Sequence, residues 1–447
     1  MKQNRIKLLV ILASIAICGS LISCEHSETL SVENIIKIAQ TLERKELYKK
    51  ALEELDGKTM YSLGNSSRTK TAISHFLNYL KGNYINRKTG NYEPNAEIQA
   101  EFPYYNPDFS GNISYVQPVN NMIFTYISND IRSSSHQLSM TLIQDGNQIQ
   151  SKMIDTGYLL NYIPKEWAGD KISNGEPLAL QSLNKVFIYN NQGTKKFTNV
   201  WDFVDEDSNT KFMSPDSEPV GKNFLYMLTN GKYVQILKNA YLHYTGNKDD
   251  IDKALASVAK YTNDFGFSDD TKYSLAWIKL FIKRCQIEID DGPIAAELTK
   301  KSSVDEAGLL VYSKLRATEE TEETSNKNVT VAAYQDNYIG FGGYMYKHYL
   351  QILKTSPFPW TSCALINFMV TTQYGFSPWG KDMGGYCSNP SSNQDHSNDG
   401  GDEYPAKNDK GYEWWIANEQ GKGKLVIEDP IYAAKISFIM SKWIDEL

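Results

Sequence analysis

Short apolar runs with the character of strands alternate with runs of helical periodicity along most of this chain. Residues 58–63 fit a strand, residues 64–67 a polar turn and residues 69–80 a helix. Further strands are expected at residues 139–143, 185–189, 308–312 and 329–334, and residues 232–299 are mostly helical. This alternation predicts an α/β architecture.

The length and the charge of the chain limit what it can be. At 447 residues it exceeds what one hydrophobic core usually organises, so two lobes are expected. The formal net charge is −7, and lysine and arginine do not cluster beyond the first residues. Because nucleic-acid binding needs clustered cations, no nucleic acid is expected as a partner.

The first 24 residues predict the compartment. Lys2, Arg5 and Lys7 precede an apolar run at residues 8–22 that is too short to span a bilayer comfortably. The run ends in Leu-Ile-Ser-Cys at residues 21–24, which resembles a bacterial lipobox. Residues 1–23 are therefore interpreted as a lipoprotein signal peptide. Cys24 is expected to carry the lipid (palmitate among its acyl chains) that attaches an extracytoplasmic protein to the membrane, in the periplasm or at the cell surface.

Cysteine and histidine patterns give no sign of a metal site or a catalytic site. Cys285, Cys363 and Cys387 remain after the signal peptide and Cys24, and none forms a C-x-x-C pair. A disulfide between Cys363 and Cys387 stays open at this point. The histidines are scattered, and no hydrolase elbow, zinc-protease or nucleotide-binding motif occurs. We therefore expect binding rather than catalysis, without a cofactor or a metal.

The turn at residues 64–68 is the best candidate for a ligand contact. It reads Gly-Asn-Ser-Ser-Arg and directly precedes a helix, where backbone N–H groups lack partners. Asn65, Ser66 and Ser67 add polar side chains, and Arg68 adds a charge. Together they suit an anionic or polyhydroxylated ligand. The alternative is a plain helix cap made by Ser66 or Ser67.

Several segments together resemble a known family. They lie at residues 63–68, 142–146, 184–190, 214–219, 310–316 and 375–382. In order and spacing they resemble the extracellular solute-binding proteins of bacterial ABC importers, and in particular the type II receptors for ferric ions, polyamines and sugar phosphates. The likeness runs from about residue 58 to the C-terminus. Residues 82–117 have no counterpart and look like an inserted surface loop.

The resemblance implies an α/β, two-lobed type II periplasmic-binding-protein fold with a central ligand cleft and crossing hinge strands. Lobe 1 would comprise residues 24–175 (with the inserted loop 82–117) plus 328–352, and lobe 2 residues 176–327 plus 353–447. The Gly-, Asn- and Asp-rich residues 375–410 are expected to be loop. Such a receptor would act as a monomer that delivers a small-molecule solute to an ABC importer permease.

The resemblance also implies which residues line the cleft. They are Asn65, Ser66, Ser67, Arg68, Asp145, Ser217, Glu218, Tyr312, Gly342 and Tyr344. A sugar phosphate or another hydroxylated anion fits the turn at residues 65–68 best. A ferric-ion receptor is the alternative, but the adjacent tyrosines of that group are missing at residues 344–346. Arg68 argues against a polyamine, and a lipid-anchored surface enzyme is less favoured still.

Overall fold

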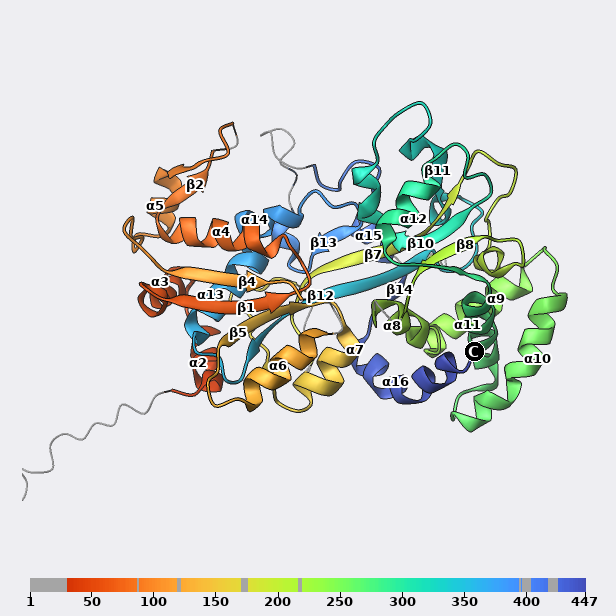
Figure 1. Ribbon diagram of the computed structural model, residues 1–447, viewed down its shortest axis with the longest axis horizontal. Coiled ribbons are helices and arrows are strands. Elements are labelled where there is room, and N and C mark those ends of the chain that lie inside the picture. The colour runs from red at the N-terminus through yellow and green to blue at the C-terminus, as the bar shows by residue number, and fades with distance from the viewer. Residues whose placement is uncertain are drawn as a thin grey trace, which may run out of the picture.

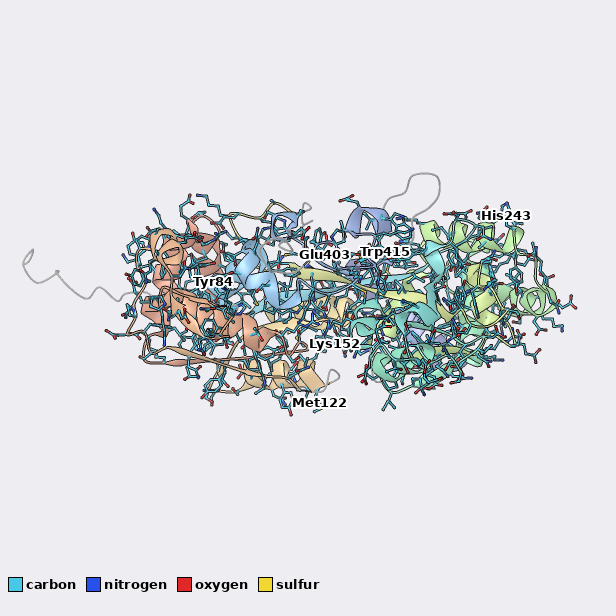
Figure 2. The ribbon with its side chains drawn as sticks, turned by 90° about the horizontal axis from the view of Figure 1, so that it is seen from above. Tyr84, Met122, Lys152, His243, Glu403 and Trp415 are labelled. Carbon is cyan, nitrogen blue, oxygen red and sulfur yellow. The ribbon has the colours of Figure 1, made fainter. Side chains whose placement is uncertain are left out.

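The computed structural model describes residues 30–86, 88–118, 122–169, 176–215, 219–393, 395, 403–416 and 425–447. The signal peptide, Cys24, Ser217 and Glu218 lie outside these residues. Figure 1 shows two lobes at opposite ends of an elongated molecule, joined by two long strands, β7 (Ala179–Asn190) and β12 (Gly343–Leu353). Seen from above, Tyr84 marks the first lobe and His243 the second (Figure 2).

The first lobe is built on the parallel strands β4, β1 and β5. Their bounds are Asn112–Val116, Thr59–Gly64 and Leu138–Ile143. Its helices are α2 (Val32–Ala39), α3 (Arg44–Leu55), α4 (Thr69–Leu80), α5 (Ala96–Glu101), α6 (Ile123–Arg132), α7 (Gly146–Gln148), α13 (Pro359–Thr371) and α14 (Gln373–Phe376). The short strands are β2 (Asn83–Ile85), β3 (Tyr92–Pro94) and β6 (Leu159–Leu160). Strand β1, its turn and helix α4 confirm the strand-turn-helix unit expected at residues 58–80.

The second lobe repeats the plan with the parallel strands β10, β8 and β9. Their bounds are Ala307–Val311, Thr210–Met213 and Gln286–Glu288. Its helices are α8 (Pro219–Met227), α9 (Gly231–Leu242), α10 (Asp249–Asp264), α11 (Lys272–Arg284), α12 (Asp291–Leu298), α15 (Tyr412–Ile416) and α16 (Pro430–Asp445), and its short strands are β11 (Val329–Val331) and β14 (Val426–Ile427). The helices between residues 231 and 298 confirm the helical segment expected there.

Strands β7 and β12 belong to both lobes. Among the described residues, one sheet has twelve strands, of which eight follow the order β4-β1-β5-β12-β7-β10-β8-β9, while β11 and β13 (Gly385–Cys387) pair with β7, and β6 and β14 pair with β12. Strand β12 runs antiparallel to β5 of the first lobe and to β7, and β7 runs antiparallel to β10 of the second. The two strands therefore cross from lobe to lobe, which confirms the predicted hinge. The parallel strands of both lobes point their carboxyl ends toward this hinge. In α/β folds, ligands bind at the carboxyl ends of the strands.

Each lobe has its own core. Tyr48, Phe76 and Phe368 belong to the first core, and Trp277 and Phe281 to the second. The rings of Trp277 and Phe281 stack with centroids 4.6 Å apart, and those of Phe76 and Phe368 lie 5.4 Å apart. Separate aromatic cores are what two lobes of this size require.

The structure differs from the sequence analysis in three places. Helix α13 packs in the first core, although residues 353–447 were expected in the second lobe. The segment 82–117 is only partly an excursion, because β4 pairs with β1 and both Phe102 and Phe109 are buried. Residues 375–410 are not all loop, because β13 (Gly385–Cys387) pairs with β7. In the last two cases, long-range strand pairing overrode the local composition.

Candidate functional site

Backbone and side-chain hydrogen bonds join the turn after β1 to neighbouring segments. The backbone N–H of Asn65 donates to the carbonyl of Leu142 at 2.9 Å, and Asn65 Oδ1 accepts from the N–H of Gln144 at 3.0 Å. Ser66 Oγ accepts from Trp379 Nε1 at 3.2 Å, and Ser67 is exposed. Helix α4 has no side-chain cap, so neither serine plays that role. Asn65 thus joins the ends of β1 and β5.

Arg68, Arg316 and Asp382 form a cluster between the lobes, which we call the arginine cluster. Arg68 lies at the start of α4, and Arg316 lies in the 3₁₀ turn Tyr312–Ala317 that follows β10. Both guanidinium groups pair with the carboxylate of Asp382, and Arg68 Nη2 donates to Asp382 Oδ1 at 2.8 Å. One carboxylate therefore links the carboxyl-end turns of both lobes.

The burial of Asp382 strengthens its ion pairs with Arg68 and Arg316. Its side chain is 4% exposed, whereas those of Arg68 and Arg316 are 20% and 39% exposed. Trp379, three residues before Asp382, packs in the first core, and Met383 packs in the second. Charge-assisted hydrogen bonds of this kind are stronger than neutral ones. Two cations around one anion also leave one net positive charge at this cluster.

A chain of neutral hydrogen bonds crosses the hinge strands beside the arginine cluster. Gln181 Nε2 contacts His348 Nδ1 at 3.1 Å, and His348 Nε2 contacts Gln144 Oε1 at 3.0 Å. Burial, with a contribution from the charge of Arg68, lowers the pKa of His348 to about 3. The imidazole is therefore neutral, so it accepts at Nδ1 and donates at Nε2. The chain links β7, β12 and the end of β5.

A second cluster between the lobes is acidic and fully buried, and we call it the acid cluster. It consists of Asp145 after β5, Asn223 on α8, Glu428 after β14 and Tyr349 on β12. Asn223 Nδ2 donates to Asp145 Oδ1 at 3.0 Å and to Glu428 Oε1 at 3.3 Å. Tyr349 donates its hydroxyl to Glu428 Oε2 at 2.7 Å. One amide thus bridges carboxylates from the two lobes.

Burial governs the protonation of the acid cluster. It raises the pKa of Glu428 to about 7, and the nearby charge of Asp145 acts in the same direction. Burial also raises the pKa of Asp145, against the hydrogen bonds that it accepts from Asn223 and Gln148. Two buried carboxyl groups in one site disfavour simultaneous ionisation.

The structure brings some of the predicted residues together and separates others. Arg68 lies at the arginine cluster with Ser66 nearby, whereas Asp145 lies at the acid cluster, where the buried ring of Tyr344 also sits. Tyr312 is buried and donates its hydroxyl to the carbonyl of Asn408 at 2.6 Å. Gly342 supplies a carbonyl to the N–H of Phe187.

Sequence reasoning missed most of both clusters. The missed residues are Arg316 and Asp382 in the arginine cluster and Asn223, Glu428 and Tyr349 in the acid cluster, and His348 of the polar chain was missed as well. Two of them carried a signal, because Arg316 and Asp382 end segments that carry the family resemblance.

The thiols stay separate. Cys285, Cys363 and Cys387 are all free, so the disulfide left open by the sequence does not form. Among the described residues, no three His, Cys, Asp or Glu side chains gather where they could hold a metal ion.

Comparison with solved structures decides the fold. A ferric binding protein from Campylobacter jejuni superposes with a TM-score of 0.52 at 12% identity, covering 87% of this chain and 98% of that one. An ABC transporter substrate-binding protein from Bradyrhizobium japonicum USDA 110 gives 0.50 at 11% identity, with the same coverage. The chain has the fold of the two-lobed periplasmic binding proteins. In this binding-protein fold, both clusters lie where the lobes meet. No family model and no curated protein sequence matches the chain.

Proposed function

We propose that this protein is a solute receptor that holds a small hydroxylated anion, such as a sugar phosphate, between its lobes and delivers it to an ABC importer permease. The observation that carries the proposal is the arginine cluster, in which guanidinium groups from opposite lobes converge on one carboxylate. A ligand acid group that replaces this carboxylate would hold the two lobes together in the same way. Arginine suits the task because its planar fork matches carboxylates and phosphates.

The charge of the site separates this proposal from its alternatives. Arg68 and Arg316 carry two positive charges against the single negative charge of Asp382, so the arginine cluster would repel a polyamine. Ferric-ion receptors of the resembled group use adjacent tyrosines, which are missing at residues 344–346, and among the described residues no three His, Cys, Asp or Glu side chains gather where they could hold a metal ion. An anion with hydroxyl groups can use the remaining positive charge and the polar chain of Gln144, His348 and Gln181.

A thermal-shift screen tests the proposed ligand class. Glucose 6-phosphate, gluconate, citrate and inorganic phosphate represent the anions. Spermidine represents the polyamines, and ferric citrate, compared with citrate alone, represents the ferric ion. We expect at least one hydroxylated anion to raise the melting temperature, because a ligand that binds only the folded state stabilises it. A shift with spermidine or ferric ion alone would contradict the proposal.

Attachment to the membrane through Cys24 is part of the same proposal. Among the described helices, none is both long enough and apolar enough to cross a membrane. We expect Cys24→Ala to release the protein from the membrane fraction or to stop its processing. Fractionation and gel migration of this variant check the prediction, with Cys285→Ala as a control that keeps the lipobox. A Cys24→Ala protein that fractionates and migrates like the wild type would rule out the lipid anchor.

A further inference from the structure

A cavity of about 810 Å³ lies against the hinge strands, away from the arginine cluster. Ser182 on β7 and Lys347 on β12 line it, and they are register partners. The adjacent register partners Gln181 and His348 belong to the polar chain described above. Because successive side chains of a strand point to opposite faces, the cavity and that chain lie on opposite faces of the hinge.

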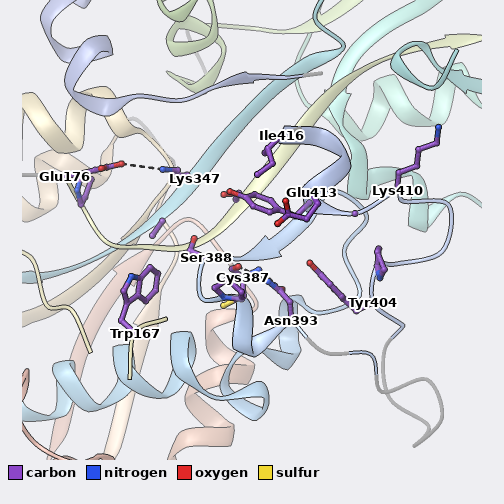
Figure 3. A pocket seen from close by; sticks show the side chains of 17 residues that line it. Trp167, Glu176, Lys347, Cys387, Ser388, Asn393, Tyr404, Lys410, Glu413 and Ile416 are labelled. Atoms are coloured by element: carbon purple, nitrogen blue, oxygen red, sulfur yellow. Dashed lines mark hydrogen bonds and ion pairs between the residues drawn. The ribbon is translucent and has the colours of Figure 1, made fainter. Parts of the chain in front are cut away.

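The walls of the cavity come from both lobes. Trp167 packs against the first core, whereas Tyr404, Tyr412 and Ile416 pack against the second. In Figure 3 the side chains of Trp167 and Tyr404 reach in from two sides, and a dashed line joins Glu176 to Lys347. A molecule in this space would therefore touch both lobes and the strands between them.

The lining combines aromatic rings with hydroxyl and amide groups. Trp167, Tyr404 and Tyr412 are half-buried and line the cavity. Ser182 and Asn393 add polar side chains, and Ser388 Oγ is buried with no hydrogen-bond partner among the described residues. Flat aromatic faces beside scattered polar groups suit a ligand that has apolar faces and polar edges.

The charges in the walls favour a neutral ligand. Lys347 Nζ lies 3.5 Å from Glu176 Oε1, and Glu413 is a second carboxylate in the lining. Lys410 also lines the cavity, but its ammonium group lies 4.6 Å from the ring centroids of Tyr334 and of Trp414. An anion would face two carboxylates, and a cation would compete with Lys347. The volume is near the top of the usual range for small-molecule sites, about 300–1,000 Å³.

We propose that this cavity is a second binding site, on the face of the hinge opposite the polar chain, for a neutral polyhydroxylated ligand of the size of a short oligosaccharide. Sugar rings would stack on Trp167 and the two tyrosines, and their hydroxyl groups would bond to Ser182, Ser388, Asn393 and the Glu176–Lys347 pair. The site is independent of the anion proposed for the arginine cluster.

Titration calorimetry with maltotriose, cellotriose and chitotriose tests the proposal on the full mature chain. We expect at least one of them to bind saturably, and Trp167→Ala to weaken that binding by about tenfold or more. Trp360→Ala is the matched control, because Trp360 is also a half-buried tryptophan of the first lobe and lies outside the cavity. Arg68→Gln should leave oligosaccharide binding unchanged.

Three outcomes would overturn the second site. One is the absence of saturable binding by all three sugars at concentrations up to about 1 mM. Another is equal affinity in Trp167→Ala and the wild type. The third is a loss of binding in Arg68→Gln, which would place the sugar at the arginine cluster.

Discussion

Arg316→Gln should weaken capture of the anionic solute about ten- to more than a hundredfold. Its guanidinium group is the contribution of the second lobe to the arginine cluster, and a lost hydrogen bond to a charged group costs about 1.5–3 kcal/mol. Calorimetric titration with the hydroxylated anion that gives the largest thermal shift measures the effect. Arg284→Gln is a matched control, because Arg284 pairs with Asp250 at 2.6 Å elsewhere in the second lobe. If Arg316→Gln and the wild type bind the anion with equal affinity, the arginine cluster is not part of the binding site.

Asp382→Asn, at the same cluster, should have the opposite effect on the affinity for the anion. In the structure the Asp382 carboxylate already occupies the space between Arg68 and Arg316, so an anionic ligand must displace it. Removing its charge should raise the affinity for the anion while it lowers the stability of the ligand-free protein. Weaker anion binding in Asp382→Asn would show that Asp382 supports the ligand instead of competing with it.

Glu428→Gln should remove a large pH dependence of stability. The pKa of Glu428 is raised to about 7 in the folded protein, whereas an unfolded chain releases this proton near pH 4.5. Between these values the folded state holds the proton and the unfolded state does not, so stability falls as the pH rises. The shift corresponds to about 3 kcal/mol.

Chemical denaturation near pH 5 and near pH 8 checks this prediction. The free energy of unfolding of the wild type should drop between the two conditions by about 2.5 kcal/mol more than that of Glu428→Gln. Glu97→Gln, at an exposed position on α5, should keep the wild-type difference. If Glu428→Gln and the wild type lose the same free energy, the pKa of Glu428 is not raised in the folded protein.

The local parts of the fold could be predicted from the sequence. Helix α4 has the bounds expected from its periodicity, and the turn before it was singled out because a polar run joins a strand to a helix. These features depend on residues that are neighbours in the chain. Arg68 was found for the same reason, since it lies at that junction.

The other half of the site could not be predicted, because its partners are distant in the sequence. Asp382 lies in a Gly- and Asn-rich stretch that has the composition of a loop, and it meets Arg68 across 314 positions. Glu428 becomes a buried acid only where Asn223, 205 positions away, and Tyr349 converge on it. No local pattern marks Glu428, and Asp382 is marked only as the end of a segment that carries the family resemblance. The placement of α13 in the first lobe is likewise a result of packing that periodicity does not report.

Native mass spectrometry of freshly purified mature protein tests the central claim most directly. We predict that the wild type carries a small acidic, hydroxylated molecule, and that the double variant Arg68→Gln/Arg316→Gln carries none. A bound polyamine or ferric ion in the wild type, or the same acidic molecule retained in full by the double variant, would contradict the account.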